Sequence, residues 1–121
     1  ILLSLLVGNL LLKNLVARDR PCWIDPDFLQ LLVSVPKDFS FPSAHTMISV
    51  SAAAALFHYS KALGIPALVI AALVGFSRLY LFVHFPTDVL AGAVIGVILA
   101  VVSCIVTDKI AARIKSKKAV N

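Results

Sequence analysis

The sequence predicts an all-α protein, a transmembrane bundle of about four helices formed by a single domain over residues 1–121. The first observation is composition: 60% of the residues are hydrophobic and 14% are charged, whereas soluble domains average about 45–50% apolar and about 25% charged residues. The second is a mean hydropathy of +1.00. The third is that the apolar residues lie in long runs separated by short polar segments. These features are typical of an integral membrane protein.

Four apolar runs are candidates for the spans. The first, residues 1–17, is shorter than the roughly 20 residues of a spanning helix, so we expect that its beginning is missing. The second, residues 43–59, is rich in Ala and Ser, which allow close helix packing, and we expect it at the centre of the bundle. The third follows a short turn over residues 60–64 and runs over residues 66–83. The fourth, residues 89–107, carries a Gly-x-x-x-Gly pair, a weak packing signal.

The polar residues are concentrated in one loop and one tail. The loop, residues 18–42, contains four of the six prolines, and we expect it outside the hydrocarbon core, with a short interfacial helix over residues 27–33. The tail, residues 108–121, is basic, and we expect an interfacial or frayed end.

Lysine and arginine fall unevenly on the two faces of this bundle, whose formal net charge is +5. The turn and the tail share one face and carry six of the eleven Lys and Arg residues. The opposite face carries five, three of which are site candidates. Because cytoplasmic loops carry the excess of Lys and Arg, we predict a cytoplasmic C-terminus and an outward-facing 18–42 loop. The surplus charge reports topology and does not indicate a nucleic-acid partner.

Three separated segments place ionisable groups on the face predicted to look outward. Such groups cost roughly 2.5–3.5 kcal/mol each at a membrane helix centre, so they are usually paired and functional. The candidates are three cations, two histidines, one carboxylate and a helix start: Lys13, Arg20, Arg78, His45, His84, Asp88 and Ser43.

These residue types indicate an anion site. Cations beside the exposed N–H groups of a helix start bind phosphate above all. Pro86 breaks the helix between His84 and Asp88, so the carboxylate can reach back to orient the imidazole. Two histidines without an acidic cluster or Cys ligands argue against a metal site, and Cys22 and Cys104 are predicted to be free thiols. On these residues alone, an interfacial His–Asp pair beside a snorkelling Arg remains an alternative.

The order and spacing of three motifs resemble the type 2 phosphatidic acid phosphatase superfamily. The motifs are Lys13 with Arg20-Pro21, then Pro42-Ser43-Ala44-His45, then Ser77-Arg78 with His84 and Asp88. Family members usually have six membrane helices, so the resemblance implies one or two further helices before the first run. It also implies a single membrane-embedded phosphatase domain over residues 1–121.

The resemblance implies an enzyme, a metal-independent lipid phosphate phosphatase without a cofactor. It would hydrolyse a lipid phosphate or diphosphate monoester such as undecaprenyl diphosphate, phosphatidic acid or phosphatidylglycerophosphate. His84 would attack phosphorus and form a phosphohistidine, Asp88 would orient and charge its ring, and His45 would protonate the leaving oxygen. The phosphoryl group would be held by Lys13, Arg20, Ser43, Ala44 and Arg78.

One departure from the family pattern is Ala44, where glycine is usual. If the position needs a positive φ, alanine is strained there by roughly 1 kcal/mol. A non-catalytic lipid-phosphate binding or transport protein, or a structural membrane subunit, therefore stays an alternative. Expected partners are the lipid phosphate substrate and membrane lipids, in a bacterial plasma membrane, with the oligomeric state open. Outside the site we expect plain loop, rim or interfacial charges: Arg18, Asp19, Lys37, Asp38 and His58.

Overall fold

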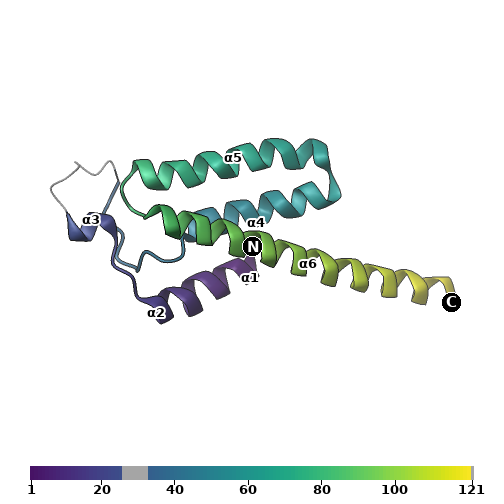
Figure 1. Ribbon diagram of the computed structural model, residues 1–121. Helices are drawn as coiled ribbons and strands as arrows, with labels where there is room; N and C mark the ends of the chain where they lie inside the picture. Colours follow the sequence, from purple (N-terminus) through teal and green to yellow (C-terminus); the bar gives the residue numbers. More distant parts are fainter. Residues whose placement is uncertain (26–32, 121) are drawn as a thin grey trace.

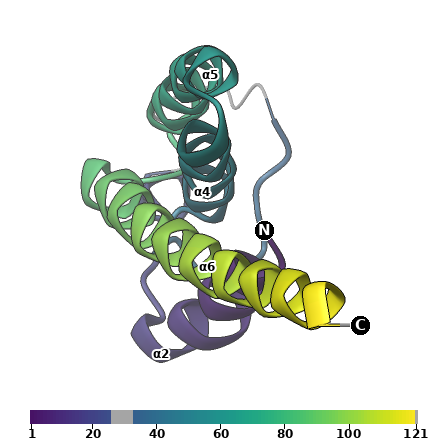
Figure 2. The same ribbon diagram turned by 90° about the vertical axis from the view of Figure 1, so that its right-hand side faces the viewer.

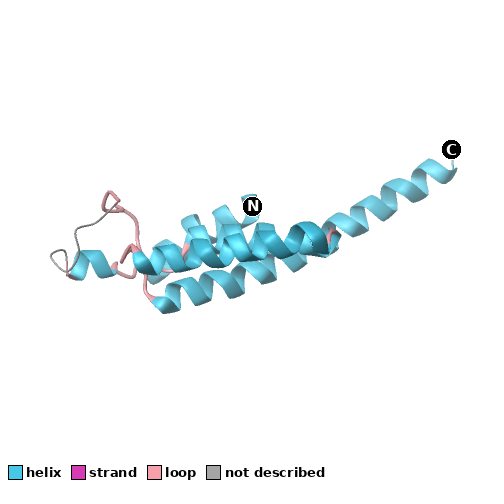
Figure 3. Ribbon diagram, turned by 90° about the horizontal axis from the view of Figure 1, so that it is seen from above, coloured by secondary structure: helices cyan, strands magenta, loops and turns pink. Residues whose placement is uncertain are grey.

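The computed structural model describes residues 1–25 and 33–120, and within these ranges the chain is helical, with no β-strand (Figures 1 and 3). The all-α prediction is confirmed. The expected interfacial helix over residues 27–33 lies, except for Val33, outside the described residues.

The N-terminal region is one continuous helical stretch. It consists of α1 (Leu2–Leu5), the π-helical segment η1 (Leu6–Leu12) and α2 (Lys13–Val16). The stretch ends at Ala17, whose φ of 47° is left-handed and turns the chain away from the helix axis. The short helix α3 (Pro21–Ile24) follows, and a proline at its first position suits a helix start because the ring already has a helical φ.

Three long helices form the body of the molecule: α4 (Ala44–Tyr59), α5 (Lys61–Tyr80) and α6 (Pro86–Val120). The predicted turn over residues 60–64 is wrong, because Ser60 alone separates α4 from α5 and Pro66 lies inside α5. The last span begins earlier than predicted, and the basic tail is helical through Val120 instead of frayed.

Gly64 explains why a helix forms where a turn was expected. A Cβ atom at Gly64 would collide with the backbone of Phe57 on α4. The glycine therefore serves the close approach of two antiparallel helices, and it does not end a helix. The first turn of α5 packs against the last turn of α4 because that side chain is missing.

α4 lies between α5 and α6, as predicted from its small residues (Figure 2). The predicted Gly-x-x-x-Gly contact is present. A Cβ atom at Gly92 would lie 2.6 Å from the carbonyl oxygen of Ser43, and one at Gly96 would lie 2.6 Å from that of Met47. The backbones of α6 and α4 therefore touch along this seam, with Met47 fully buried beside it.

Two helices of the described part are long and apolar enough to cross a membrane. These are α5 and Pro86–Lys118 of α6, which contain 18-residue windows with mean hydropathies of 1.9 and 2.9. α4 has 16 residues and falls short of the usual spanning length. A helix of 35 residues, the length of α6, extends about 52 Å, whereas the hydrocarbon core is about 30 Å thick. The end of α6 accordingly projects beyond α4 and α5 (Figure 1).

Candidate active site

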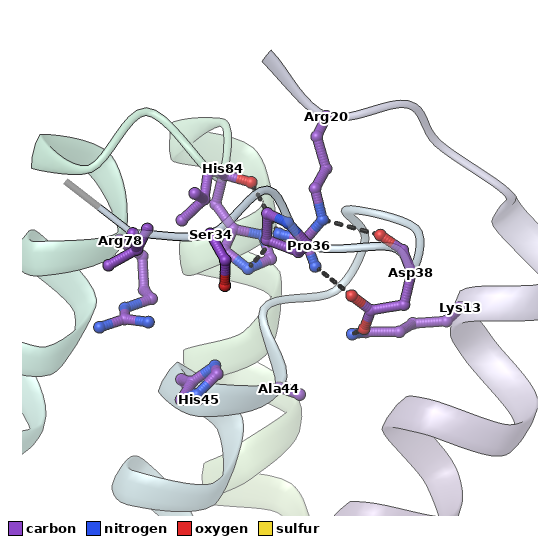
Figure 4. A pocket seen from close by; sticks show the side chains of 11 residues that line it. Lys13, Arg20, Ser34, Pro36, Asp38, Ala44, His45, Arg78 and His84 are labelled. Carbon is purple, nitrogen blue, oxygen red and sulfur yellow. Dashed lines mark hydrogen bonds and ion pairs between the residues drawn. The ribbon is translucent and has the colours of Figure 1, made fainter. Parts of the chain in front are cut away.

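A polar pocket of about 240 Å³ opens where the start of α4, the end of α5 and the α5–α6 connection meet (Figure 4). Ligand pockets for whole drug-sized molecules are about 300–1,000 Å³, so this volume suits a small headgroup. The charged and polar lining comes from elements far apart in sequence: Lys13, Arg20, Ser34, Asp38, His45, Arg78 and His84.

His84 lies in the connection between α5 and α6, almost fully buried at 4% exposure. The turn that leads to it contains Phe82, with a left-handed φ of 55°. Its Nε2 is 3.2 Å from Arg20 Nη1. Because a guanidinium can only donate, Nε2 must accept, and the ring proton is assigned to Nδ1. Nε2 thus carries the ring's lone pair, which accepts from Arg20, and His84 lines the pocket.

The ring of His84 is held neutral. Burial and the positive charge of Arg20 together lower the pKa of His84 to about 4, although the negative charge of Asp88 opposes both. The distance from His84 Nδ1 to Asp88 Oδ2 is 3.6 Å, which is too long for a hydrogen bond. Nδ1 is buried without a hydrogen-bond partner among the described residues, and the Asp88 carboxylate is the nearby negative charge.

Asp88 is fully buried in the first turn of α6, and its carboxylate is saturated with donors. Arg18 Nη1 donates to Oδ1 at 2.8 Å. The backbone N–H of Phe85 donates to Oδ2 at 2.8 Å, and the Ser40 hydroxyl donates to the same oxygen. The Asp88 carboxylate is therefore oriented by three donors from two different loops.

The expectation that Arg18 is a plain loop charge is wrong. Besides Asp88, its Nη1 donates to the Thr87 hydroxyl at 2.6 Å. Its guanidinium also lies 4.1 Å from the centroid of the Phe85 ring, a cation–π contact. Arg18 thereby ties the loop after α2 to the start of α6.

Lys13 and Arg20 share one acidic partner, Asp38. Both cations are buried, at 5% and 3% exposure. Arg20 Nη2 donates to Asp38 Oδ1 at 2.8 Å, and Lys13 Nζ contacts Oδ2. Partial burial raises the pKa of Asp38, but the two cations outweigh this and hold it below its ordinary value. Asp38 is thus part of the site, not the rim charge that the sequence predicted.

Arg20 is the most connected side chain of the pocket. It also donates from Nε to the backbone oxygen of Asp38 at 2.7 Å and from Nη1 to that of Val83 at 2.8 Å. Arg78, on the last turn of α5, contrasts with it. Arg78 Nε donates to the Ser77 hydroxyl at 3.2 Å, and no carboxylate within the described ranges pairs with it.

The start of α4 presents Ala44 and His45 to the pocket. Ala44 is the first residue of α4 and is not among the described non-glycine residues with positive φ, so the strain expected there is absent. Ser43 is fully buried, its hydroxyl lies 3.0 Å from Thr46 Oγ1, and it does not line the pocket. The hydroxyl of Ser43 is thus engaged with Thr46 in this arrangement, and its contact with a phosphate stays a prediction. Its backbone N–H instead donates to the Asp88 carbonyl at 3.0 Å, which fixes α4 against α6.

Six of the eight predicted site residues line the pocket, and Asp88 lies directly behind His84. Three participants were missed: Arg18, Ser40 and Asp38. No spacing pattern marks them in the sequence. The one available signal was electrostatic, because a buried Asp and buried cations each need partners of opposite charge.

Within the described ranges, no group of three or more His, Cys, Asp or Glu side chains is placed to hold a metal ion. Cys22 and Cys104 are buried free thiols, as predicted.

Comparison with known proteins identifies relatives of this arrangement. Residues 1–111 match the PAP2 superfamily. The undecaprenyl-diphosphatase of Sulfolobus acidocaldarius is 38% identical over 86 residues, which cover 69% of this chain and 41% of that protein. Phosphatidylglycerophosphatase B of Bacillus subtilis is 37% identical over 113 residues, 82% of this chain and 53% of that protein. The chain therefore spans about half the length of the curated relatives it matches.

A solved structure shares the fold. The crystal structure of a transmembrane PAP2-type phosphatidylglycerolphosphate phosphatase from Bacillus subtilis superposes with a TM-score of 0.69 at 38% identity. The match covers 84% of this chain and 53% of that one.

Proposed function

Because the chain belongs to the PAP2 superfamily, we propose that it is a lipid phosphate phosphatase of a membrane, which uses His84 as nucleophile and requires no metal ion or cofactor. The observation that carries this proposal is the His84 ring, neutral and buried, with Nε2 facing a pocket that holds three cations. The substrate would be a lipid phosphate or diphosphate monoester.

In the first step, Nε2 of His84 attacks phosphorus, and the bond from phosphorus to the lipid-side oxygen breaks. The ring becomes positively charged as the Nε2–P bond forms, and Asp88, 3.6 Å from Nδ1, stabilises that charge. His45 lies across the pocket on the first turn of α4 and would donate a proton to the leaving oxygen. The products are a phosphohistidine and a lipid with a free hydroxyl or a shortened phosphate chain.

In the second step, His45, now neutral, takes a proton from water, and the resulting hydroxide attacks phosphorus. The Nε2–P bond breaks, its electron pair returns to His84, and inorganic phosphate leaves. Lys13, Arg20, Arg78 and the N–H groups at the start of α4 would stabilise the phosphoryl oxygens in both steps.

A lipid substrate is supported by where the pocket lies. It opens at one end of α5 and α6, the two helices able to cross a membrane, so a headgroup could enter while its chains stay between lipids. Undecaprenyl diphosphate, phosphatidic acid and phosphatidylglycerophosphate are the candidates. The excess of basic residues on the tail favours a site on the outer face of a bacterial plasma membrane, with the C-terminus in the cytoplasm.

The test is phosphate release in detergent from each of the three lipids with EDTA present. We expect the wild type to release phosphate and His84→Ala to release none. His58→Ala, which removes a histidine outside the pocket, is the matched control and should release phosphate. A radiolabelled phosphoryl group should be trapped on the wild type as an acid-labile, alkali-stable adduct. Release that survives in His84→Ala, or that stops with EDTA, would contradict the proposal. Lipid phosphate bound without release would instead indicate a non-catalytic binding or transport protein.

A further inference from the structure

The pocket proposed to bind an anion already contains one. The carboxylate of Asp38 lies between Lys13 and Arg20, with one oxygen on each cation (Figure 4). A phosphoryl group would present two oxygens to the same pair of donors in the same bridging manner. Asp38 and a phosphate therefore compete for these two side chains.

This competition reduces the positive charge that the pocket offers to a phosphate. Of its three cations, Lys13 and Arg20 are paired with Asp38, and Arg78 has no acidic partner in the described part of the chain. A phosphate that entered beside an ionised Asp38 would meet a like charge. Two of the three cations of the pocket would already be paired with Asp38. The pKa of Asp38 lies below its ordinary value, so the carboxylate remains ionised at neutral pH.

Arg20 connects this competition to the nucleophile. The guanidinium that holds Asp38 through Nη2 also lies 3.2 Å from His84 Nε2 through Nη1. While Arg20 stays in this position, the lone pair of His84 is engaged as a hydrogen-bond acceptor. A phosphoryl group that recruits Arg20 would draw it from both partners and free Nε2 for attack.

We propose that Asp38 is a built-in competitor for phosphate, which occupies Lys13 and Arg20 in the substrate-free protein and sets the affinity of the site for anions. The proposal rests on the proposed function of this pocket. Asp38 is suited to leave, because its side chain is 55% exposed and can turn toward water. Asp88, the other carboxylate of the site, is fully buried and cannot.

The test measures binding of inorganic phosphate and of orthovanadate to the full chain in detergent, by calorimetry, for the wild type and Asp38→Asn. We expect the Kd of both anions to fall by about fivefold in Asp38→Asn, the scale of two partly exposed ion pairs that no longer oppose binding. Asp38→Ser is the second variant if the amide disturbs the loop. Asp19→Asn removes the same charge from an exposed position outside the pocket and should leave Kd unchanged.

An unchanged or higher Kd in Asp38→Asn and Asp38→Ser would overturn the proposal, because Asp38 would then hold Lys13 and Arg20 in position for phosphate. An equal fall in Asp19→Asn would overturn it too, since overall charge would be the cause. Binding requires no turnover, so these outcomes are separate from failure of the proposed function, which appears as absent phosphate release. Where turnover is present, the KM of Asp38→Asn should fall with Kd.

Discussion

Among the described residues there are two His–Asp pairs, one near each end of α4, and only one of them lies at a pocket with cations. His84 and Asp88 are 3.6 Å apart, with side chains 3% and 0% exposed. His58 and Asp108 are 3.0 Å apart, with side chains 49% and 50% exposed. The pair with the shorter distance, His58 and Asp108, is the one that does not lie at the candidate active site.

The difference lies in what surrounds each pair. Within the described ranges, the hydrogen bonds of Asp108 go to α4, to His58 and to the Tyr59 hydroxyl at 3.0 Å. The cavity beside His58 is about 80 Å³ and has no second charged residue in its lining. Around His84, which is 4% exposed, Arg20 Nη1 donates to Nε2 and the buried Asp88 carboxylate lies 3.6 Å from Nδ1. Burial among fixed charges, and not residue identity or a short contact, is what makes His84 the candidate nucleophile.

Asp88→Asn should give the largest effect among changes that keep both histidines. An Asn amide cannot stabilise the positive charge that develops on His84, and its NH₂ can face Nδ1 and favour the wrong tautomer. We expect kcat/KM to fall by about 10³-fold or more, measured as phosphate release from the best lipid substrate. Thermal unfolding in detergent serves as the control for folding. A loss below tenfold in a folded variant would remove Asp88 from the proposed mechanism.

The pH profile of kcat/KM tests the lowered pKa of His84. His84 protonates only as the pH falls through its folded-state pKa of about 4. Since kcat/KM reports the free enzyme, protonation of His84 should cause no fall in activity from pH 6.5 to 5.5. A nucleophilic histidine with the ordinary pKa of about 6.5 would lose about fivefold over the same interval. An acid limb with its midpoint near pH 6.5 would be the opposite result.

Arg18→Gln probes how the buried pair is held in place. Glutamine cannot supply the charge that reaches Asp88 Oδ1 at 2.8 Å. We expect kcat/KM to fall by about fivefold with a smaller change in KM, because Arg18 acts on Asp88 and does not line the pocket. Arg18→Lys should recover part of the loss. Equal losses in Gln and Lys variants would show that packing on Phe85 matters and charge does not.

His58→Ala should give the smallest effect, less than twofold in kcat/KM. Exposed ion pairs contribute little to stability. His58 does not line the pocket that contains Lys13, Arg20 and His84. The same phosphate-release assay measures it. A loss comparable to that of Arg18→Gln would mean that the two ends of α4 are coupled.

Much of the fold was predictable because its signals are local. Long apolar runs predicted the helices, the small residues of α4 predicted its central place, and the Gly92/Gly96 pair was a weak signal of close packing that named no partner helix. The start of α5 was not predictable in this way. Gly64 and Pro66 have the composition of a turn, and only the contact of Gly64 with Phe57 shows why the helix runs through them.

The site divides in the same manner. Six of the eight predicted residues, all from the spaced motifs, line the pocket. Their partners Arg18, Ser40 and Asp38 lie in the loop after α2, where no periodicity tells which side chain meets which. Which side chains pair in this loop depends on the path of its backbone, and no residue spacing in the sequence indicates that path.

The close approach at Gly92 divides the molecule into a part that can be redesigned and a part that cannot. At Gly92 the backbone of α6 contacts the backbone of Ser43, one residue before the pocket-lining start of α4. The positions of the two histidines relative to each other therefore depend on a backbone contact, which no side-chain substitution can relax. Residues 33–38 border the same pocket through side chains on a loop. An engineer seeking another headgroup would vary that loop and leave the seam untouched.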